Sequence, residues 1–126
     1  LKNKNSRIFS SLGQLKYLSC VKFVDGVIGN SSSGLLEVPS FKKGTINIGD
    51  RQKGRAQASS IINCKPEKIS IGLAIKKLYS KKFNKRLAST KNPYGSGGAS
   101  KKIIKIIRTF NLVGILKKQF HDLNPL

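Results

Sequence analysis

The chain has 126 residues, 38% of them hydrophobic, and a formal net charge of +20. This length allows one domain with a modest core, and the apolar content predicts a compact fold rather than disorder. No apolar run is long enough to span a bilayer, and no signal-peptide core follows the first residues, so neither a membrane protein nor a secreted one is expected. Because the sequence contains no Met, we expect a fragment, a processed form or an excerpt of a longer protein.

Residues that commonly build metal sites and catalytic triads are sparse. Cys20 and Cys64 are the only cysteines, with a spacing that fits no metal or redox motif. We expect two buried, reduced thiols in a cytoplasmic protein, with a disulfide as the less favoured alternative. His121 is the only histidine and lies in the C-terminal tail, which argues against a zinc site or a histidine-based triad.

The basic charge makes nucleic acid a candidate partner. No acidic residue occurs between Lys68 and His121, and a strongly basic domain is a candidate for nucleic-acid binding. The lysines, however, follow the solvent faces of amphipathic helices, and aromatic residues are not interleaved with them. The pattern therefore disfavours a nucleic-acid-binding module.

The first half of the chain predicts short strands alternating with helices. Apolar residues at helical spacing predict a helix before Asp25, and the β-branched run after it suits a buried parallel strand. In chain order, the expected elements are a strand over 7–12, a helix over 14–23 with Leu15, Leu18, Val21 and Val24 on one face, a strand over 26–29, a helix over 33–41 that stops near Pro39, a strand over 45–48, a loop over 52–60 and a strand over 61–64.

The second half predicts two amphipathic helices separated by a glycine-rich loop. Pro66 and Glu67 suit the first turn of the first helix. The expected elements are a helix over 67–83 with Ile71, Ala74, Ile75 and Leu78 on one face, a loop over 92–98, a helix over 99–110 with Ile103, Ile106, Ile107 and Phe110 on one face, and a short helix around Leu116.

This alternation predicts an α/β fold, a Rossmann-like parallel sheet with flanking helices and right-handed crossovers. About four strands are visible, whereas a doubly wound domain usually has roughly five or six. We therefore expect a domain over residues 1–110 that lacks its first strands, followed by a tail or short helix over 111–126.

A cluster of serines follows the strand predicted over 26–29, namely Ser31, Ser32 and Ser33 before Gly34. Ligands of parallel sheets bind at this end of the strands, where small residues and hydroxyls suit a phosphate. A helix cap fits the local chemistry equally well. A serine nucleophile is disfavoured because no base and no G-x-S-x-G elbow accompany it. The glycosylation sequon at Asn30 would matter only in a secreted protein.

Two further segments favour phosphate binding. Glu37 is one of five acidic residues and follows the serines, where its carboxylate suits ribose hydroxyls, although it also complements a helix N-terminus. Arg51 and Arg55 flank a glycine-bearing loop after the next strand, and guanidinium groups suit phosphate oxygens. The residues that follow two adjacent predicted strands are thus of the types that bind a nucleotide.

Together these segments resemble the C-terminal half of the hydrolysing UDP-N-acetylglucosamine 2-epimerases of bacterial sialic acid synthesis. The likeness runs from about residue 5 to residue 110 and rests on the segments S-L-G-x-x-x-Y-L, G-N-S-S-S-G-L-L-E-V-P-S-F, T-I-N-I-G-D-R-Q-K-G-R and N-P-Y-G. It implies most of the C-terminal domain of a GT-B-type fold, a UDP-sugar substrate, and no metal or redox cofactor.

The resemblance also implies roles for single residues. Ser31 and Ser32 would contact the diphosphate, and Ser33 and Gly34 would shape the turn. Glu37 would bind the ribose, and Arg51 would contact the nucleotide phosphates. The loop of Ser11 and Leu12 would lie near the uracil. The family reaction eliminates UDP across C1–C2 and adds water to give N-acetylmannosamine.

The chain departs from the family in ways that limit this reading. Family members are roughly three times longer, so the N-terminal domain is a missing partner, and a second copy of the chain is a further candidate partner. Lys42-Lys43-Gly44 replaces a segment that commonly holds Gly and Pro. We expect no catalytic residue here and no turnover by this chain alone. A UDP- or GDP-linked amino sugar of a legionaminic-type pathway remains an alternative substrate.

Overall fold

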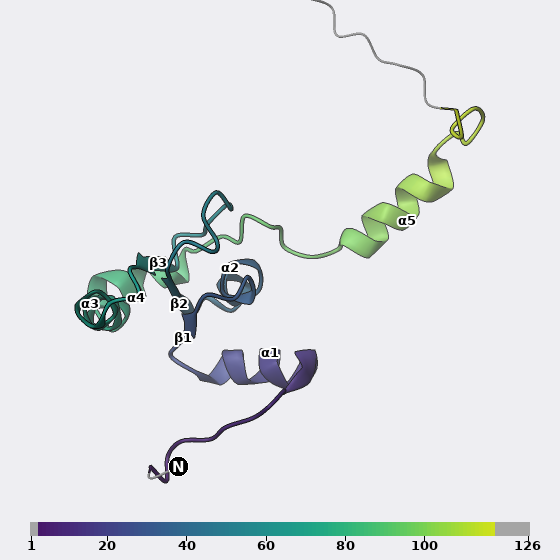
Figure 1. The fold of residues 1–126 in the computed structure, drawn as a ribbon. Coiled ribbons are helices and arrows are strands. Elements are labelled where there is room, and N and C mark those ends of the chain that lie inside the picture. Colours follow the sequence, from purple (N-terminus) through teal and green to yellow (C-terminus); the bar gives the residue numbers. More distant parts are fainter. Residues whose placement is uncertain (1–2, 118–126) are drawn as a thin grey trace, which may run out of the picture. The chain divides into compact units, whose positions relative to one another are not determined.

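The structure is a computed structural model that describes residues 3–117 (Figure 1). Its internal contacts divide the chain into two compact units, the first ending at Ser96 and the second beginning at Gly97. The two units are described separately.

The first unit is built on a three-stranded parallel sheet. Its strands are β1 (Gly26–Gly29), β2 (Gly44–Ile48) and β3 (Ile61–Cys64), in the order β1-β2-β3. Ile28 pairs with Ile46, which in turn pairs with Ile62. The predicted α/β fold with a parallel sheet is confirmed, and the three strands lie where the β-branched runs placed them.

Helices cover both faces of this sheet (Figure 1). The single turn α2 (Ser33–Leu36) and the 3-10 helix η1 (Val38–Phe41) pack on one face, where α1 (Gly13–Phe23) contacts η1. Helices α3 (Lys68–Leu78) and α4 (Lys81–Ala88) form the layer on the other face. The connection from β1 to β2 therefore runs over one face, and the chain after β3 runs over the other.

Alternate residues of the central strand β2 face the two layers, as the pleat of a strand requires. Ile46 belongs to the core on the α3 side, which comprises Ile46, Ile62, Ala74, Leu78, Phe83 and Leu87. Its neighbour Thr45 faces α2, because its Oγ1 donates to the carbonyl of Gly34 (2.8 Å). The α2 side is more polar, since Thr45 and Asn47 are both buried there.

The strand predicted over residues 7–12 is wrong. That segment has no regular secondary structure and pairs with no strand of the described chain, and Ile8 and Phe9 are 75% and 62% exposed. Favourable β propensity reflects packing on a sheet surface, and it does not form a strand without a neighbour to pair with. The helix over 14–23 is confirmed, but only Val21 of its predicted apolar stripe is buried.

The single helix predicted over 67–83 is two helices, because Ser80 interrupts it. Ser80 is extended (φ −70°, ψ 141°), and its hydroxyl accepts a hydrogen bond from the Phe83 N–H (3.3 Å) as the N-cap of α4. The same hydroxyl donates to the carbonyl of Lys77 at the end of α3 (2.8 Å). One serine thus ends α3 and begins α4, and Phe83 of the second helix reaches the core.

Three smaller expectations also change. The helix over 33–41 is instead α2 followed by η1, with Pro39 inside η1. Residues 113–116 form a turn rather than a helix around Leu116, and His121 lies outside the described residues. Both cysteines are free as expected, but Cys20 is exposed and Cys64 is only partly buried.

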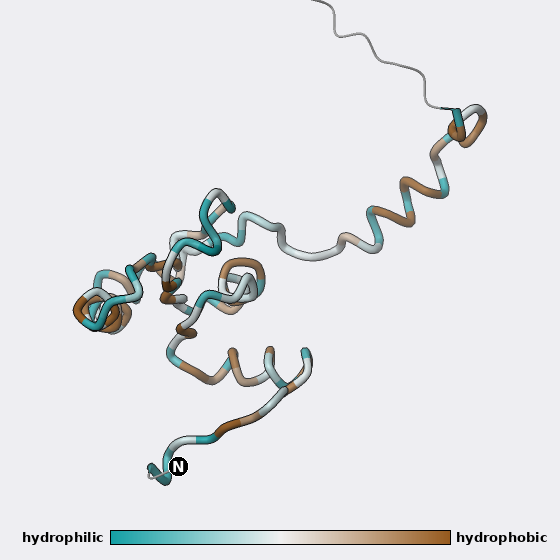
Figure 2. Tube along the Cα trace, viewed as in Figure 1, coloured by the Kyte–Doolittle hydropathy of each residue, from teal (hydrophilic) through white to brown (hydrophobic). Residues whose placement is uncertain are grey.

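The second unit contains helix α5 (Ala99–Thr109), which confirms the helix predicted there. Its sequence alternates between apolar and basic residues, as the tube in Figure 2 shows. The apolar side chains remain exposed in the structure, between 55% and 63% for Ile103, Ile106, Ile107 and Phe110.

Candidate functional site

The serines form a tight turn at the carboxyl end of β1, which we name the serine loop (residues 30–33). Ser31 Oγ accepts from the Ser33 N–H (3.4 Å), and the Ser31 carbonyl accepts from the Gly34 N–H (3.2 Å). Ser32 is the N-cap of α2 but makes no side-chain cap hydrogen bond. In this cluster, Ser31 rather than Ser32 therefore accepts the kind of backbone N–H bond that a helix cap makes. Because α2 is only one turn long, its dipole is weak, and the serine hydroxyls are the main groups that could donate hydrogen bonds to an anion here.

Ser33 connects the serine loop to α1. Its Oγ donates to Tyr17 Oη, with 2.5 Å between the two oxygens. Tyr17 is the tyrosine of the segment S-L-G-x-x-x-Y-L. Two segments that are far apart in the sequence therefore meet through this bond.

Position 34 must be glycine for α2 to pack on β2. A Cβ atom built at Gly34 would lie 2.6 Å from Thr45 Cγ2, closer than real Cβ contacts. Thr45 is only 2% exposed, and its hydroxyl donates to the Gly34 carbonyl (2.8 Å). The close approach packs α2, directly after the serine loop, onto this face of β2.

The loop after β2, which we name the arginine loop (residues 49–57), is attached to the serine loop. Arg51 and Arg55 are exposed, whereas Gln52 between them is 3% exposed. The Gln52 Nε2 donates to the carbonyl of Asn30, the first residue of the serine loop (2.8 Å). The two loops singled out in the sequence are thus joined at the carboxyl ends of the neighbouring strands β1 and β2.

The N-P-Y-G segment is hydrogen-bonded both to the helical segment after the serine loop and to the arginine loop. The sequence motifs did not predict this role. The Asn92 Nδ2 donates to the carbonyl of Leu36 (2.8 Å) and to Ser40 Oγ (2.7 Å). Tyr94 Oη donates to the carbonyl of Ala56 in the arginine loop (3.0 Å). The motif was visible in the sequence, but its partners lie about 40 to 60 residues away and only the fold identifies them.

Glu37 lies differently from expectation, and the Ser11–Leu12 segment makes a local contact just before α1. Glu37 is not in the first turn of a helix, since it is the C-cap of α2 and the residue before η1, partly buried and without a cap hydrogen bond from its side chain. Ser11 Oγ accepts a local bond from the Gly13 N–H (3.2 Å), and Leu12 precedes α1. The hydrogen bond from the serine loop to α1 is that of Ser33 to Tyr17.

A hollow of about 620 Å³ opens at the carboxyl ends of β2 and β3, where α3 begins. Its lining includes Asp50, Asn63, Cys64 and Lys65. Burial raises the pKa of the Cys64 thiol, which disfavours the thiolate. Cys64 therefore has the character of a structural thiol rather than of an activated nucleophile.

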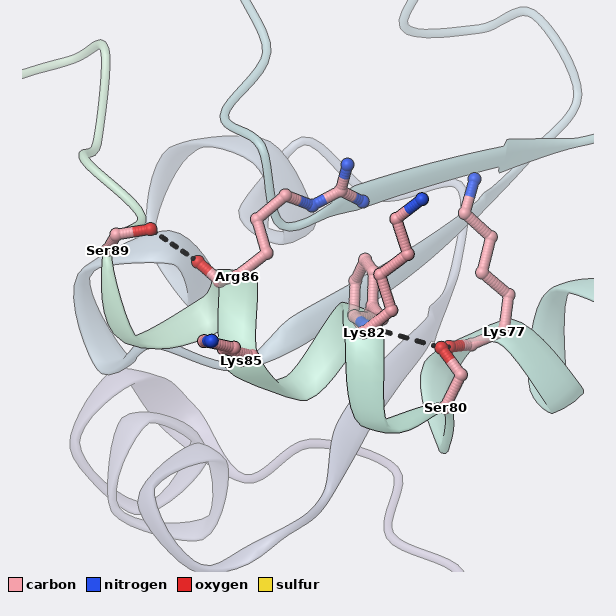
Figure 3. Close-up of a pocket in the computed structure, with 7 residues that line it drawn as sticks. Lys77, Ser80, Lys82, Lys85, Arg86 and Ser89 are labelled. Carbon is pink, nitrogen blue, oxygen red and sulfur yellow. Dashed lines mark hydrogen bonds between the residues drawn. The ribbon is translucent and has the colours of Figure 1, made fainter.

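A second hollow, of about 770 Å³, lies on the α3–α4 side of the sheet, and we name it the basic hollow. Its lining consists of Lys77, Ser80, Lys82, Phe83, Lys85, Arg86 and Ser89. Figure 3 shows the charged ends of Lys77, Lys82 and Arg86 directed to the same side. The Phe83 ring is 2% exposed beneath the Arg86 guanidinium (5.1 Å to the ring centroid), so it offers no face for stacking a base.

The described residues hold few groups for acid–base or metal chemistry. Within residues 3–117, no group of three or more His, Cys, Asp or Glu side chains could hold a metal ion. Asp25, Asp50 and Glu67 are exposed, and Asp25 accepts a bond from Tyr79 Oη (3.3 Å). Over the same range, no helix has the length and apolarity needed to cross a membrane.

Comparison with known proteins agrees with the resemblance of the sequence motifs. A family model described as UDP-N-acetylglucosamine 2-epimerase matches residues 1–108. The chain is 48% identical over 124 residues to the GDP/UDP-N,N'-diacetylbacillosamine 2-epimerase (hydrolyzing) of Campylobacter jejuni, covering 95% of this chain and 32% of the relative. It is 44% identical over 104 residues to the polysialic acid biosynthesis protein P7 of Escherichia coli, covering 82% of this chain and 27% of the relative.

A more distant relative is the UDP-N,N'-diacetylbacillosamine 2-epimerase (hydrolyzing) of Legionella pneumophila, 28% identical over 106 residues, which are 84% of this chain and 27% of the relative. The chain thus spans about a third or less of the length of these relatives. The family match covers most of the chain, including all four segments that meet around α2. The chain belongs to the UDP-N-acetylglucosamine 2-epimerase family.

Proposed function

We propose that this chain is the UDP-binding part of a hydrolysing UDP-N-acetylglucosamine 2-epimerase, which converts UDP-N-acetylglucosamine and water to N-acetylmannosamine and UDP. One observation carries the proposal. The serine loop and the arginine loop lie together at the carboxyl ends of two adjacent parallel strands, joined by the bond from Gln52 to Asn30. That edge of a parallel sheet is where nucleotides bind.

The roles of the side chains follow from their chemistry. Ser31 and Ser32 offer hydroxyls to the diphosphate, and Arg51 and Arg55 offer guanidinium groups with donors suited to phosphate oxygens. Glu37, one helical turn behind the serines, offers an acceptor for ribose hydroxyls. Ser33 and Gly34 would shape the turn, and the family resemblance assigns the Ser11–Leu12 segment to the uracil.

Calorimetric titration with UDP and 2′-deoxy-UDP tests this proposal. The unmodified chain is expected to bind UDP and to bind the deoxy analogue more weakly. Glu37→Gln should weaken UDP binding about tenfold or more, because hydrogen bonds to a charged group contribute roughly 1.5–3 kcal/mol. It should also reduce the preference for UDP over the deoxy analogue. Glu67→Gln, at an exposed carboxylate before α3, is the matched control and should bind as the unmodified chain does.

We further propose that this chain alone does not turn over its substrate. Elimination and hydration need an acid and a base placed on the sugar. With Glu37 assigned to the ribose, the other described carboxylates are Asp25, Asp50 and Glu67, which lie on three different segments. Incubation of the chain with UDP-N-acetylglucosamine should release no N-acetylmannosamine, and product above background would contradict the proposal.

A second substrate is favoured by the Campylobacter jejuni relative, whose name specifies N,N'-diacetylbacillosamine linked to GDP or UDP. On this reading, the chain would bind the nucleotide of a UDP- or GDP-linked diacetamido sugar. Competition between UDP and GDP tests which nucleotide the site accepts. Equal affinity favours the nucleotide specificity in that name, whereas a strong preference for UDP excludes a GDP-linked sugar and agrees with either UDP-linked sugar.

A further inference from the structure

We infer that Gln52 is a positioning residue for the diphosphate, an inference that rests on the proposed function. Gln52 is the buried residue of the arginine loop, at 3% exposure, and both of its neighbours in the sequence, Arg51 and Lys53, are exposed. Its Nε2 donates to the Asn30 carbonyl (2.8 Å). A single carboxamide therefore connects the loop that carries the guanidinium groups to the loop that carries the hydroxyls.

The bond to Asn30 orients the group next to it. The peptide between Asn30 and Ser31 is planar and trans, so its carbonyl and its N–H point in opposite directions. With the carbonyl held toward the buried Gln52, the N–H of Ser31 points to the opposite side, where the Ser31 side chain is exposed. The same bond holds the arginine loop at Gln52. Because Arg51 is the residue before Gln52, the bond also restrains the backbone from which the Arg51 side chain extends.

The energetics indicate that Gln52 contributes more than stability. Its Oε1 is buried and accepts no hydrogen bond from the described residues. Burying an unpaired amide oxygen is unfavourable, and an apolar side chain of similar size would avoid that cost. A residue chosen only for packing would therefore be apolar here. The bond to the serine loop explains why a carboxamide occupies the position.

The decisive experiment compares the chain with its Gln52→Met variant, which keeps the length of the side chain and removes the donor. UDP and uridine affinities are measured by NMR titration. We expect UDP binding to weaken roughly five- to tenfold, as the loss of one hydrogen bond implies, while uridine binding stays unchanged because uridine has no phosphate. The unfolding midpoint should stay the same or rise. Gln57→Met, at an exposed glutamine of the same loop, should change neither affinity.

Hydrogen exchange of the unliganded variant gives a readout that needs no nucleotide. The amides of the serine loop should exchange faster in Gln52→Met than in the unmodified chain. The exchange rates of the amides in the sheet should stay unchanged. If Gln52→Met does not fold, Gln52→Leu replaces it, since the shorter apolar side chain likewise cannot donate to Asn30.

The outcomes separate the inference from the proposed function. If the unmodified chain binds UDP and Gln52→Met binds it equally well, the positioning role alone is overturned. An equal loss of UDP and uridine affinity, with a lower unfolding midpoint, would overturn it in favour of a purely structural role. If the unmodified chain does not bind UDP, the nucleotide-binding function itself is wrong, and the role of Gln52 toward the diphosphate is overturned with it.

Discussion

Replacement of Gly34 by alanine tests the packing that places the serine loop. The added Cβ would lie 2.6 Å from Thr45 Cγ2. Thr45 is 2% exposed and is held by its bond to the Gly34 carbonyl (2.8 Å), so it has little room to turn away. Forcing an extra methyl into packed surroundings costs about 1–3 kcal/mol, and weakening the Thr45 bond adds about 0.5–1.5 kcal/mol.

Helix propensity offsets part of this cost, because alanine is favoured over glycine within a helix by roughly 0.5–1 kcal/mol. We therefore expect Gly34→Ala to lower the free energy of unfolding by about 2 kcal/mol, measured by urea unfolding. In thermal unfolding this corresponds to a fall in Tm of roughly 4–8 °C per kcal/mol for a unit of this size.

Two variants decide whether the steric explanation is right. Gly72→Ala, within α3, places a Cβ with no atom within 4 Å and should be neutral or stabilising. Thr45→Ser removes the methyl that collides with the new Cβ but keeps the hydroxyl, so the double variant Gly34→Ala/Thr45→Ser should recover most of the loss. The reasoning is refuted if Gly34→Ala is as stable as Gly72→Ala, or if Thr45→Ser restores nothing.

Three further predictions concern other parts of the first unit. Asn92→Leu removes the three hydrogen bonds of a partly buried carboxamide, two donated by Nδ2 and one accepted by Oδ1, and should lower the free energy of unfolding by about 1–3 kcal/mol, measured in urea; an unchanged midpoint would contradict this. Charge reversal by Lys82→Glu with Arg86→Glu should reduce salt-sensitive retention on duplex DNA and leave UDP affinity unchanged; a loss of UDP binding would place the nucleotide in the basic hollow. Cys20 should be alkylated before Cys64 at mildly alkaline pH, because burial raises the pKa of the Cys64 thiol. Since the folded state favours the protonated thiol, stability should fall as the pH rises above the usual thiol pKa.

The sequence determined the sheet and the location of the candidate site. Short β-branched runs marked the three strands, and residues at helical spacing marked the helices. The serine loop and the arginine loop could be assigned to neighbouring strand ends because parallel strands present their carboxyl ends at one edge. These features depend on local periodicity and on chain order, both of which a sequence displays.

The tertiary structure decided what holds these segments together. Ser80 divides a continuous helical pattern because its hydroxyl and its extended backbone serve the ends of both helices. Residues 7–12 form no strand because a strand requires a neighbour with which to pair. Gln52 and Asn92 carry polar side chains in a basic, polar sequence, and nothing local distinguishes them from solvated residues. Their hydrogen-bond partners lie 22 and 56 residues away, so only the folded chain shows which carbonyls they hold.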